Sequence, residues 1–297
     1  MTTIEIFERG IVREIPSTWD EMTPDQVRFV MSTYDACIRC GKSPLEFNIR
    51  VLYHFLGLKH NWRSIRWERL HPELVEARNA NIYSLCERCL GFLFDMTDGD
   101  SLQLSFSTTA NALSSVRRGW LRRRLVGPDD LLQNLTYGEF RHAATALNDF
   151  FKNRRLEDLD ECIAFLYRVR VKTPNRAGRF VKNVDNATFH RDVRRAARLP
   201  FWQKNLIMSW FAACINYLQT GIVTIDGEEI DMSQLFARNT EKSTTAFTWN
   251  DLLIQIAKDQ TVGNMERIDE EPLFTIFSIM WHNVKEQKRD EKARKAH

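Results

Sequence analysis

The chain has 297 residues, of which 43% are hydrophobic and 27% are charged, and its formal net charge is +3. These proportions are ordinary for a globular protein and exclude a largely disordered chain. The small net charge does not by itself imply a polyanionic partner. The length is close to the roughly 250 to 300 residues at which a single core stops growing, so we expect one or two hydrophobic cores.

Helix-start signals appear twice near the N-terminus. The first is Thr23-Pro24-Asp25-Gln26, which places an N-cap residue, a proline and a glutamine in the order that opens a helix, and the second is Ser43-Pro44-Leu45-Glu46. The segment before the second signal, Ala36–Ser43, partly matches a phosphate-binding loop. Since Ser43 is better placed as a helix cap, we do not expect nucleotide binding there.

Two C-x-x-C pairs raise the question of a metal site. They are Cys37 with Cys40 and Cys86 with Cys89, and four thiolates could hold a zinc ion in a tetrahedral site. Both pairs lie in helical patterns, however, where residues three apart simply share a face, and buried cysteine packs well as a small apolar residue. We therefore predict packing thiols and no cofactor, with structural zinc as the alternative.

A basic cluster lies in the middle of the chain. It consists of Arg117, Arg118, Trp120, Arg122, Arg123 and Arg124, and a second basic stretch runs from Arg168 to Arg198. Trp120 is the only aromatic residue inside the cluster, whereas a stacking surface for nucleic acid needs several. We interpret both regions as solvated charged faces, and nucleic-acid binding by the first cluster and the basic stretch after Arg168 is the alternative.

The segment from Gly127 to Arg168 contains the clearest local signals. Gly127-Pro128-Asp129-Asp130 has turn chemistry. Thr136 and Glu139 fit a capping box, in which the side chain of each residue accepts a hydrogen bond from the backbone N–H of the other. The spacing then predicts a helix with an apolar face, followed by a second helix whose start carries the acidic run Asp158–Glu161.

A domain boundary is expected after this segment. The residues Lys172 to Arg179 are polar and prone to turns, so we place the boundary between residues 168 and 186. This division gives an N-terminal helical lobe at residues 1–170 and a C-terminal helical lobe with a charged tail at residues 186–297. A single domain is the alternative.

The stretch from Asn205 to Ile225 has no charged side chain and is long enough to span a bilayer. Polar residues interrupt it, so we predict a central buried helix and no membrane partner. Residues 222–225 and 228–231 flank Asp226-Gly227, which favours a two-residue hairpin. The alternation of Leu102, Leu104 and Phe106 favours another short strand.

Helix signals continue to the C-terminus, where Thr248 to Asp251 opens a helix and the segment from Glu266 ends in a charged tail. The fold class that we predict is mostly α and multi-helical, with one or two small β-hairpin excursions. The start of the chain lacks the features of a secretory signal, so we expect a cytoplasmic location in a bacterial host.

Several of these motifs together resemble a family of proteins from Bacteroidetes phages and prophages. The resemblance is carried by Gly127-Pro128-Asp129, Leu135-Thr136-Tyr137-Gly138-Glu139-Phe140 and Leu166-Tyr167-Arg168. It extends through Trp19–Gln26, Leu199-Pro200, Leu235-Phe236 and Trp249–Leu253, and it departs at Val169, where the family usually has proline.

The resemblance implies a non-enzymatic role in the tail-gene module, most specifically that of a tail assembly chaperone binding the tape-measure protein. The histidines show no H-E-x-x-H spacing, and no catalytic residues are expected. A groove formed by the C-terminal helices could hold an amphipathic segment, although the same residues would also serve as core. Its candidate residues are Trp249, Leu252, Leu253, Ile256, Leu273 and Phe277. The alternatives are a nucleic-acid-binding phage factor and a structural component of the virion.

Overall fold

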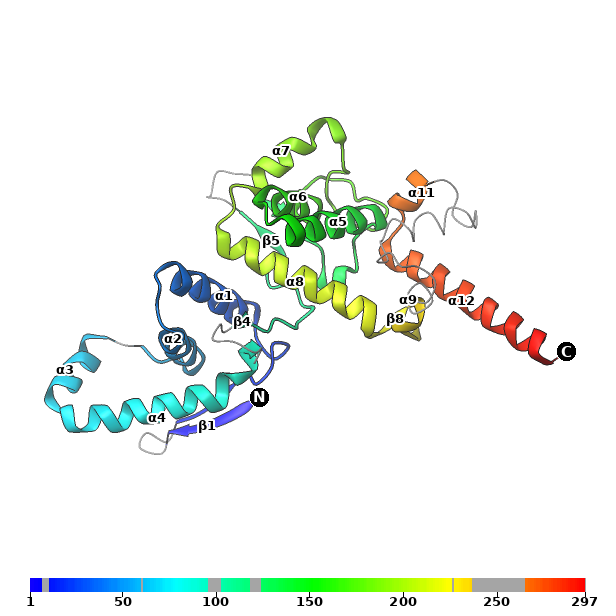
Figure 1. Cartoon of the computed structure of the whole chain (residues 1–297). Helices are drawn as coiled ribbons and strands as arrows, with labels where there is room; N and C mark the ends of the chain where they lie inside the picture. Colours follow the sequence, from blue (N-terminus) through cyan, green and yellow to red (C-terminus); the bar gives the residue numbers. More distant parts are fainter. Residues whose placement is uncertain are drawn as a thin grey trace. The chain divides into compact units, whose positions relative to one another are not determined.

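The computed structural model describes residues 1–6, 11–59, 61–95, 103–117, 124–225, 227–236 and 265–296 (Figure 1). Within these ranges the fold is mostly helical, as predicted, and its strands form four small antiparallel sheets. The chain divides into two compact units. Unit 1 comprises residues 1–108 and 201–206, and unit 2 comprises residues 109–200 and 207–297.

Unit 1 begins with a hairpin that the sequence patterns did not predict, in which β1 (Thr2–Ile6) pairs with β2 (Ile11–Ile15). Four helices follow: α1 (Pro24–Arg39), α2 (Pro44–Leu56), α3 (Trp62–Leu70) and α4 (Pro72–Leu90). A short helical turn η2 (Gly91–Leu93) leads into β3 (Phe94–Asp95), which pairs with β4 (Gln103–Leu104). The strand predicted around Leu104 is therefore present in part, and Leu102 lies outside the described residues.

The first two helices start where the sequence predicts. Thr23 N–H donates to Gln26 Oε1 (2.8 Å), and Gln26 N–H donates to Thr23 Oγ1 (3.3 Å). Ser43 Oγ accepts from Glu46 N–H (3.3 Å), and α2 is capped after Leu56 by Gly57, whose φ of 66° suits glycine. Contacts with both α1 and α4 place α2 between them. It buries Phe47, Val51, Leu52, Phe55 and Leu56.

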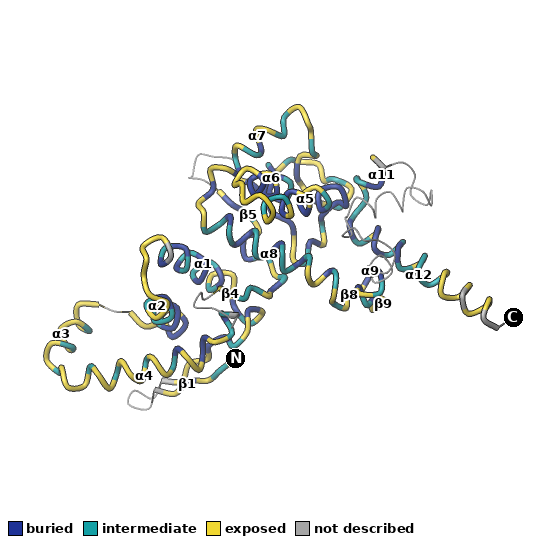
Figure 2. The backbone as a smooth tube through the Cα atoms, in the orientation of Figure 1, coloured by how far each residue is buried: buried dark blue, intermediate teal, exposed yellow. Residues whose placement is uncertain are grey.

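The helices α3 and α4 bury little of their surface. None of the residues of α3 is buried, and those of α4 that are buried, Cys86, Cys89 and Leu90, lie at its C-terminal end. Figure 2 accordingly shows α3 and most of α4 as exposed. Most helices in globular proteins are held by the packing of an apolar face. This pair of helices lacks that support along most of its length.

Unit 2 combines a three-stranded sheet with a helical core. The strands are β5 (Ser115–Val116), β6 (Leu125–Val126) and β7 (Arg168–Val169), with β6 in the middle. The turn η3 (Asp130–Leu132) leads to α5 (Tyr137–Asn153), α6 (Leu156–Leu166), α7 (Asn186–Ala196) and α8 (Phe201–Thr220). Then come β8 (Ile222–Ile225), β9 (Glu228–Asp231), α9 (Ser233–Phe236), α11 (Met265–Glu270) and α12 (Leu273–Ala296).

The prediction of an apolar helix after Asn205 is confirmed by α8, whose Ile207, Trp210, Phe211 and Cys214 are buried. The ring of Phe211 contacts that of Phe140 of α5 edge to face. No helix in the described part of the chain is both long and apolar enough to cross a membrane. The predicted hairpin is also confirmed, since β8 and β9 pair in antiparallel register.

The C-terminal helices are tied to the start of α5. Tyr137 N–H donates to Glu271 O (2.9 Å), and Leu273 N–H donates to Leu135 O (2.9 Å). Arg141 of α5 donates two hydrogen bonds to the Asp269 carboxylate, at 3.2 and 2.7 Å. These contacts join residues more than a hundred positions apart in the chain.

Residues 168–186, where the sequence suggested a domain boundary, lie within unit 2. The segment is bonded back onto β7, because Lys182 N–H donates to Val169 O (3.1 Å) and Val171 N–H donates to Phe180 O (3.0 Å). Arg168 and Arg179 are both buried, so the prediction that this basic stretch is a solvated face is wrong at these two positions. The helix predicted to begin between Thr248 and Asp251 falls outside the described residues.

Candidate partner-binding site

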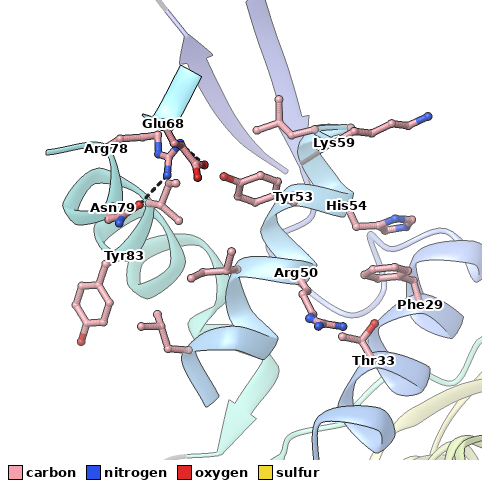
Figure 3. A pocket seen from close by; sticks show the side chains of 15 residues that line it. Phe29, Thr33, Arg50, Tyr53, His54, Lys59, Glu68, Arg78, Asn79 and Tyr83 are labelled. Atoms are coloured by element: carbon pink, nitrogen blue, oxygen red, sulfur yellow. Dashed lines mark hydrogen bonds and ion pairs between the residues drawn. The ribbon is translucent and has the colours of Figure 1, made fainter. Parts of the chain in front are cut away.

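A pocket of about 840 Å³ opens on unit 1, over α2 and between the side chains of α1 and α4 (Figure 3). Its apolar lining is Phe29 from α1, Leu45, Ile49 and Tyr53 from α2, Leu58 after α2, and Ile82 and Tyr83 from α4. We call this site the unit 1 groove. Its volume lies within the roughly 300 to 1,000 Å³ that is usual for ligand pockets.

An aromatic stack forms the side of the groove nearest α1. Phe29 and His54 lie almost parallel, with ring centroids 3.7 Å apart and an interplanar angle of 7°. Burial lowers the pKa of His54, and the charge of Asp25 opposes this effect. The neutral imidazole therefore suits this wall better than the imidazolium ion.

A polar contact joins α3 to α4 at the other side of the groove. Arg78 of α4 donates to Glu68 of α3 (2.9 Å) and to its neighbour Asn79 (3.1 Å), as Figure 3 shows. The Arg78 guanidinium also lies 5.8 Å from the centroid of the Trp67 ring. Arg78 thus holds α3 through Glu68, whereas no apolar residue of α3 is buried.

The rim of the groove carries cations, of which Arg50 is paired with Glu46 and Arg78 with Glu68. Arg50 and Lys59 line it, and Arg50 donates to Glu46 one turn earlier (2.7 Å). An open apolar groove with cations at its edge can take the apolar face of a helix and contact acidic side chains beside that face. Chemically, the site is suited to holding a partner.

The turn at Gly127, the helix start at Thr136 and the helix end at Tyr167 meet inside unit 2. Arg168 Nη1 donates to Glu139 Oε1 (2.7 Å), and Arg179 Nη1 lies 3.6 Å from Glu139 Oε2. Glu139 Oε2 also accepts from Thr136 N–H (3.2 Å), which completes the predicted capping box. The exposed fractions of Glu139, Arg168 and Arg179 are 4%, 1% and 2%. Together with Gly127 and Tyr167 we call these residues the motif cluster.

Gly127 and Tyr167 close the cluster by direct contact. A Cβ atom at Gly127 would lie 2.5 Å from the Tyr167 ring, so only glycine fits. The Tyr167 hydroxyl donates to Leu113 O (2.8 Å), and burial raises its pKa. Arg179 donates to Val126 O (2.6 Å) and Leu166 O, and burial lowers its pKa. The motif cluster is therefore a buried, internal scaffold of unit 2.

The two cysteine pairs are not assembled into a metal centre. Cys37, Cys86 and Cys89 are buried and Cys40 is exposed. Burial raises the pKa of Cys86 to about 11 and also raises the pKa values of Cys37 and Cys89, which favours their neutral thiol form. Across the described ranges, no group of three or more His, Cys, Asp or Glu side chains is placed to hold a metal ion.

The residues predicted to form a C-terminal groove are differently placed. Leu273 and Phe277 are fully buried in unit 2, so they belong to its core and not to an open groove. Trp249, Leu252, Leu253 and Ile256 lie outside the described residues. The unit 1 groove has no member in common with this predicted set.

The predicted nucleic-acid cluster connects two paired strands. Val116 of β5 pairs with Leu125 of β6, so Arg117 and Arg124 leave the sheet side by side, and both are exposed. Arg124 Nε donates to Ser115 Oγ (2.5 Å). The other members, Arg118, Trp120, Arg122 and Arg123, lie outside the described residues.

Comparison with protein-family models, with curated proteins and with solved structures found no match for this chain. The groove geometry must therefore be interpreted from its own residues. The sequence motifs did not predict this groove. An unusual pattern lies in the neighbouring helix α3, which contributes Glu68 to the groove. The segment Trp62–Leu70 alternates large apolar residues with arginines, which is unusual for a helix that packs into a core.

Proposed function

We propose that this chain is a non-enzymatic phage or prophage tail-module protein that acts through protein contacts, most specifically as a tail assembly chaperone. The observation that supports the proposal is the open apolar groove of unit 1, which lies next to helices that bury almost none of their surface. Exposed apolar surface of this kind usually marks an interaction site. The family resemblance of the motif segments supplies the tail-assembly context.

The proposed mechanism is recognition of a helix face. An amphipathic segment of a tail protein such as the tape measure would place its apolar side chains against Ile49, Tyr53 and Ile82. The groove would thereby cover the apolar side chains of the tail-protein segment and keep that segment from aggregating until assembly. The contact is largely hydrophobic, so binding is expected to survive raised salt.

The test is affinity purification of the tagged chain from induced or infected cells, with a high-salt and nuclease wash and mass spectrometry of the retained proteins. We expect a tail protein to be retained by the unchanged chain and lost with Ile49→Asp or Ile82→Asp, which place a charge in the groove. Leu156→Asp is the matched control, because Leu156 is 49% exposed in unit 2. Retention of a tail protein by both groove variants would contradict the proposal.

A second candidate function is nucleic-acid binding through the arginine cluster that lies between β5 and β6 in the sequence. It is favoured by the exposed Arg117 and Arg124, which the strand register places side by side. Phosphate contacts make binding fall steeply with salt. Binding of RNA or DNA that weakens with salt and is reduced by Arg117→Gln with Arg124→Gln, in a chain that retains no tail protein, would favour this candidate over the chaperone.

A further inference from the structure

Helix α3 has its polar and apolar sides reversed. Ser64 and Glu68 are its partly sheltered residues, and Glu68 is bonded to Arg78 of α4. Its large apolar residues face solvent instead, with exposed fractions of 65% for Trp62, 41% for Ile65 and 63% for Leu70. A surface helix normally buries its apolar stripe and exposes its charges. A partner that covers the exposed side of α3 would therefore bury more apolar surface than one that covers its sheltered side.

The same side carries three arginines. Arg63, Arg66 and Arg69 are exposed, and their spacing of three residues keeps them on the side of α3 that faces away from Ser64 and Glu68. Within the described part of the chain, none of the three is recorded in an ion pair. We call this surface, made of Trp62, Arg63, Ile65, Arg66, Arg69 and Leu70, the α3 outer face.

We infer that the α3 outer face binds an acidic amphipathic α-helix of a protein partner. The guanidinium groups offer planar, paired donors that match carboxylates, and the apolar side chains between them need an apolar counterpart. Nine residues of helix extend about 14 Å, which is between two and three turns of a partner helix. Asp or Glu residues three or four apart on such a helix would repeat at the spacing of the arginines.

The chemistry of the face favours a protein over a nucleic acid. Single-stranded nucleic acids are held by aromatic rings on which bases stack. Here the Arg63 guanidinium lies 5.5 Å from the Trp62 ring centroid, and Arg78 covers the Trp67 ring. Ile65 and Leu70 offer aliphatic area that bases cannot stack on. A helix on a lipid surface separates its cations from its apolar residues, whereas α3 interleaves them on one side.

The inference goes beyond the proposed function because it uses a different side of α3. The residue that α3 contributes to the unit 1 groove is Glu68, which belongs to the sheltered side of the helix. Binding at the α3 outer face therefore does not require an open groove, and the two sites can be disrupted separately.

The experiment uses the full chain and a fluorescent helical peptide of about 20 residues, with leucines on one face and glutamates beside them. A second peptide has glutamine at every glutamate position. Anisotropy titrations are expected to give roughly tenfold tighter binding of the acidic peptide. The triple variant R63Q/R66Q/R69Q should abolish this preference, because it removes the three cations and leaves an uncharged polar side chain at each position.

The matched control is R191Q/R194Q/R198Q, which removes the same charge from three exposed arginines in and after α7 of unit 2. It should bind the acidic peptide as the unchanged chain does. Circular dichroism and the thermal midpoint of each variant verify that the chain remains folded. Ile49→Asp, which alters the groove, should leave the preference for the acidic peptide over the glutamine peptide unchanged.

Equal affinity for the two peptides, or equal loss in the two triple variants, would overturn the inference. It would also be overturned if oligo-dT or vesicles containing phosphatidylglycerol bound more tightly than the acidic peptide and lost that binding only in R63Q/R66Q/R69Q. Loss of peptide binding in Ile49→Asp alone would assign the peptide to the groove and overturn the assignment to α3.

Discussion

The motif cluster of unit 2 and the α3 outer face of unit 1 show opposite arrangements of charge and apolar surface. The first buries a carboxylate and two guanidinium groups almost completely, and the second leaves Trp62 and Leu70 mostly exposed. The residues that are most distinctive in sequence thus hold unit 2 together. The surface with the features of a binding site lies on a segment without any of those motifs.

The energetic consequences should differ as much as the arrangements. Burying charged groups costs free energy that their mutual attraction only partly offsets. In the motif cluster, Arg168 Nε and Nη2 and Arg179 Nε are buried and have no hydrogen-bond acceptor among the described residues. The cluster therefore depends on Glu139, whereas α3 contributes little to stability. Four predictions test this difference.

The largest effect is expected from Glu139→Gln. Glutamine keeps the capping geometry but leaves two buried guanidinium groups without a counter-charge. We expect the free energy of unfolding of unit 2 to fall by about 3–5 kcal/mol, measured by urea denaturation. Glu157→Gln at an exposed position should change it by less than about 0.5 kcal/mol. Similar losses in Glu139→Gln and Glu157→Gln would show that the buried charge of Glu139 does not stabilise the motif cluster.

A smaller effect is expected from Gly127→Ala. The added methyl group would lie 2.5 Å from the Tyr167 ring, and the ring or the turn must move to accommodate it. We expect a loss of about 1–3 kcal/mol in the free energy of unfolding. Gly91→Ala in unit 1 is the comparison, since nothing lies within 4 Å of its Cβ position, and this variant should be neutral. If both variants leave the free energy of unfolding unchanged, the close contact between Gly127 and the Tyr167 ring does not affect stability.

The α3 outer face should tolerate the change Trp62→Gln combined with Leu70→Gln. Both side chains are mostly exposed, so each substitution should alter the free energy of unfolding by no more than about 0.5 kcal/mol. Binding of the acidic helical peptide should nevertheless weaken, because the apolar contacts are lost. A large loss of stability would show that α3 already packs against its own chain.

The smallest effect is a dependence on pH that comes from His54. Its pKa is lowered in the folded chain, so the unfolded chain binds more protons between that value and the ordinary pKa of about 6.5. The free energy of unfolding is therefore unaffected by His54 above pH 6.5, where His54 is neutral in both states. It decreases as the pH falls below 6.5, because the folded chain resists protonation of His54. The urea midpoint should therefore drop slightly more between pH 7 and pH 5 in the unchanged chain than in His54→Gln. An equal drop would exclude His54 as a contributor.

Local signals in the sequence predicted those parts of the fold that depend on neighbouring residues. The capping residues Thr23, Ser43 and Thr136 each start a helix, and the hairpin around Asp226-Gly227 has the expected strands. The sheet of β5, β6 and β7 was not predictable in this way, because each strand has two residues and its pairing depends on the tertiary fold.

The same limit applies to the sites. Glu139 was correctly predicted to bond back to Thr136, but its contact with Arg168 joins residues 29 positions apart. The unit 1 groove draws side chains from α1, α2, α3 and α4, which no single motif connects. Only the reversed pattern of α3 could have been noticed in advance, because burial follows a helical period that can be counted along the sequence.

The bonds between α5 and the C-terminal helices have a consequence for the order of folding during synthesis. The N–H of Tyr137 and the carbonyl of Leu135 find their partners in Glu271 and Leu273. A ribosome makes roughly 5–20 residues per second, so more than 130 further residues take several seconds to appear. Throughout that interval the beginning of α5 remains uncovered, and unit 2 acquires its final contacts only after the last helices have emerged.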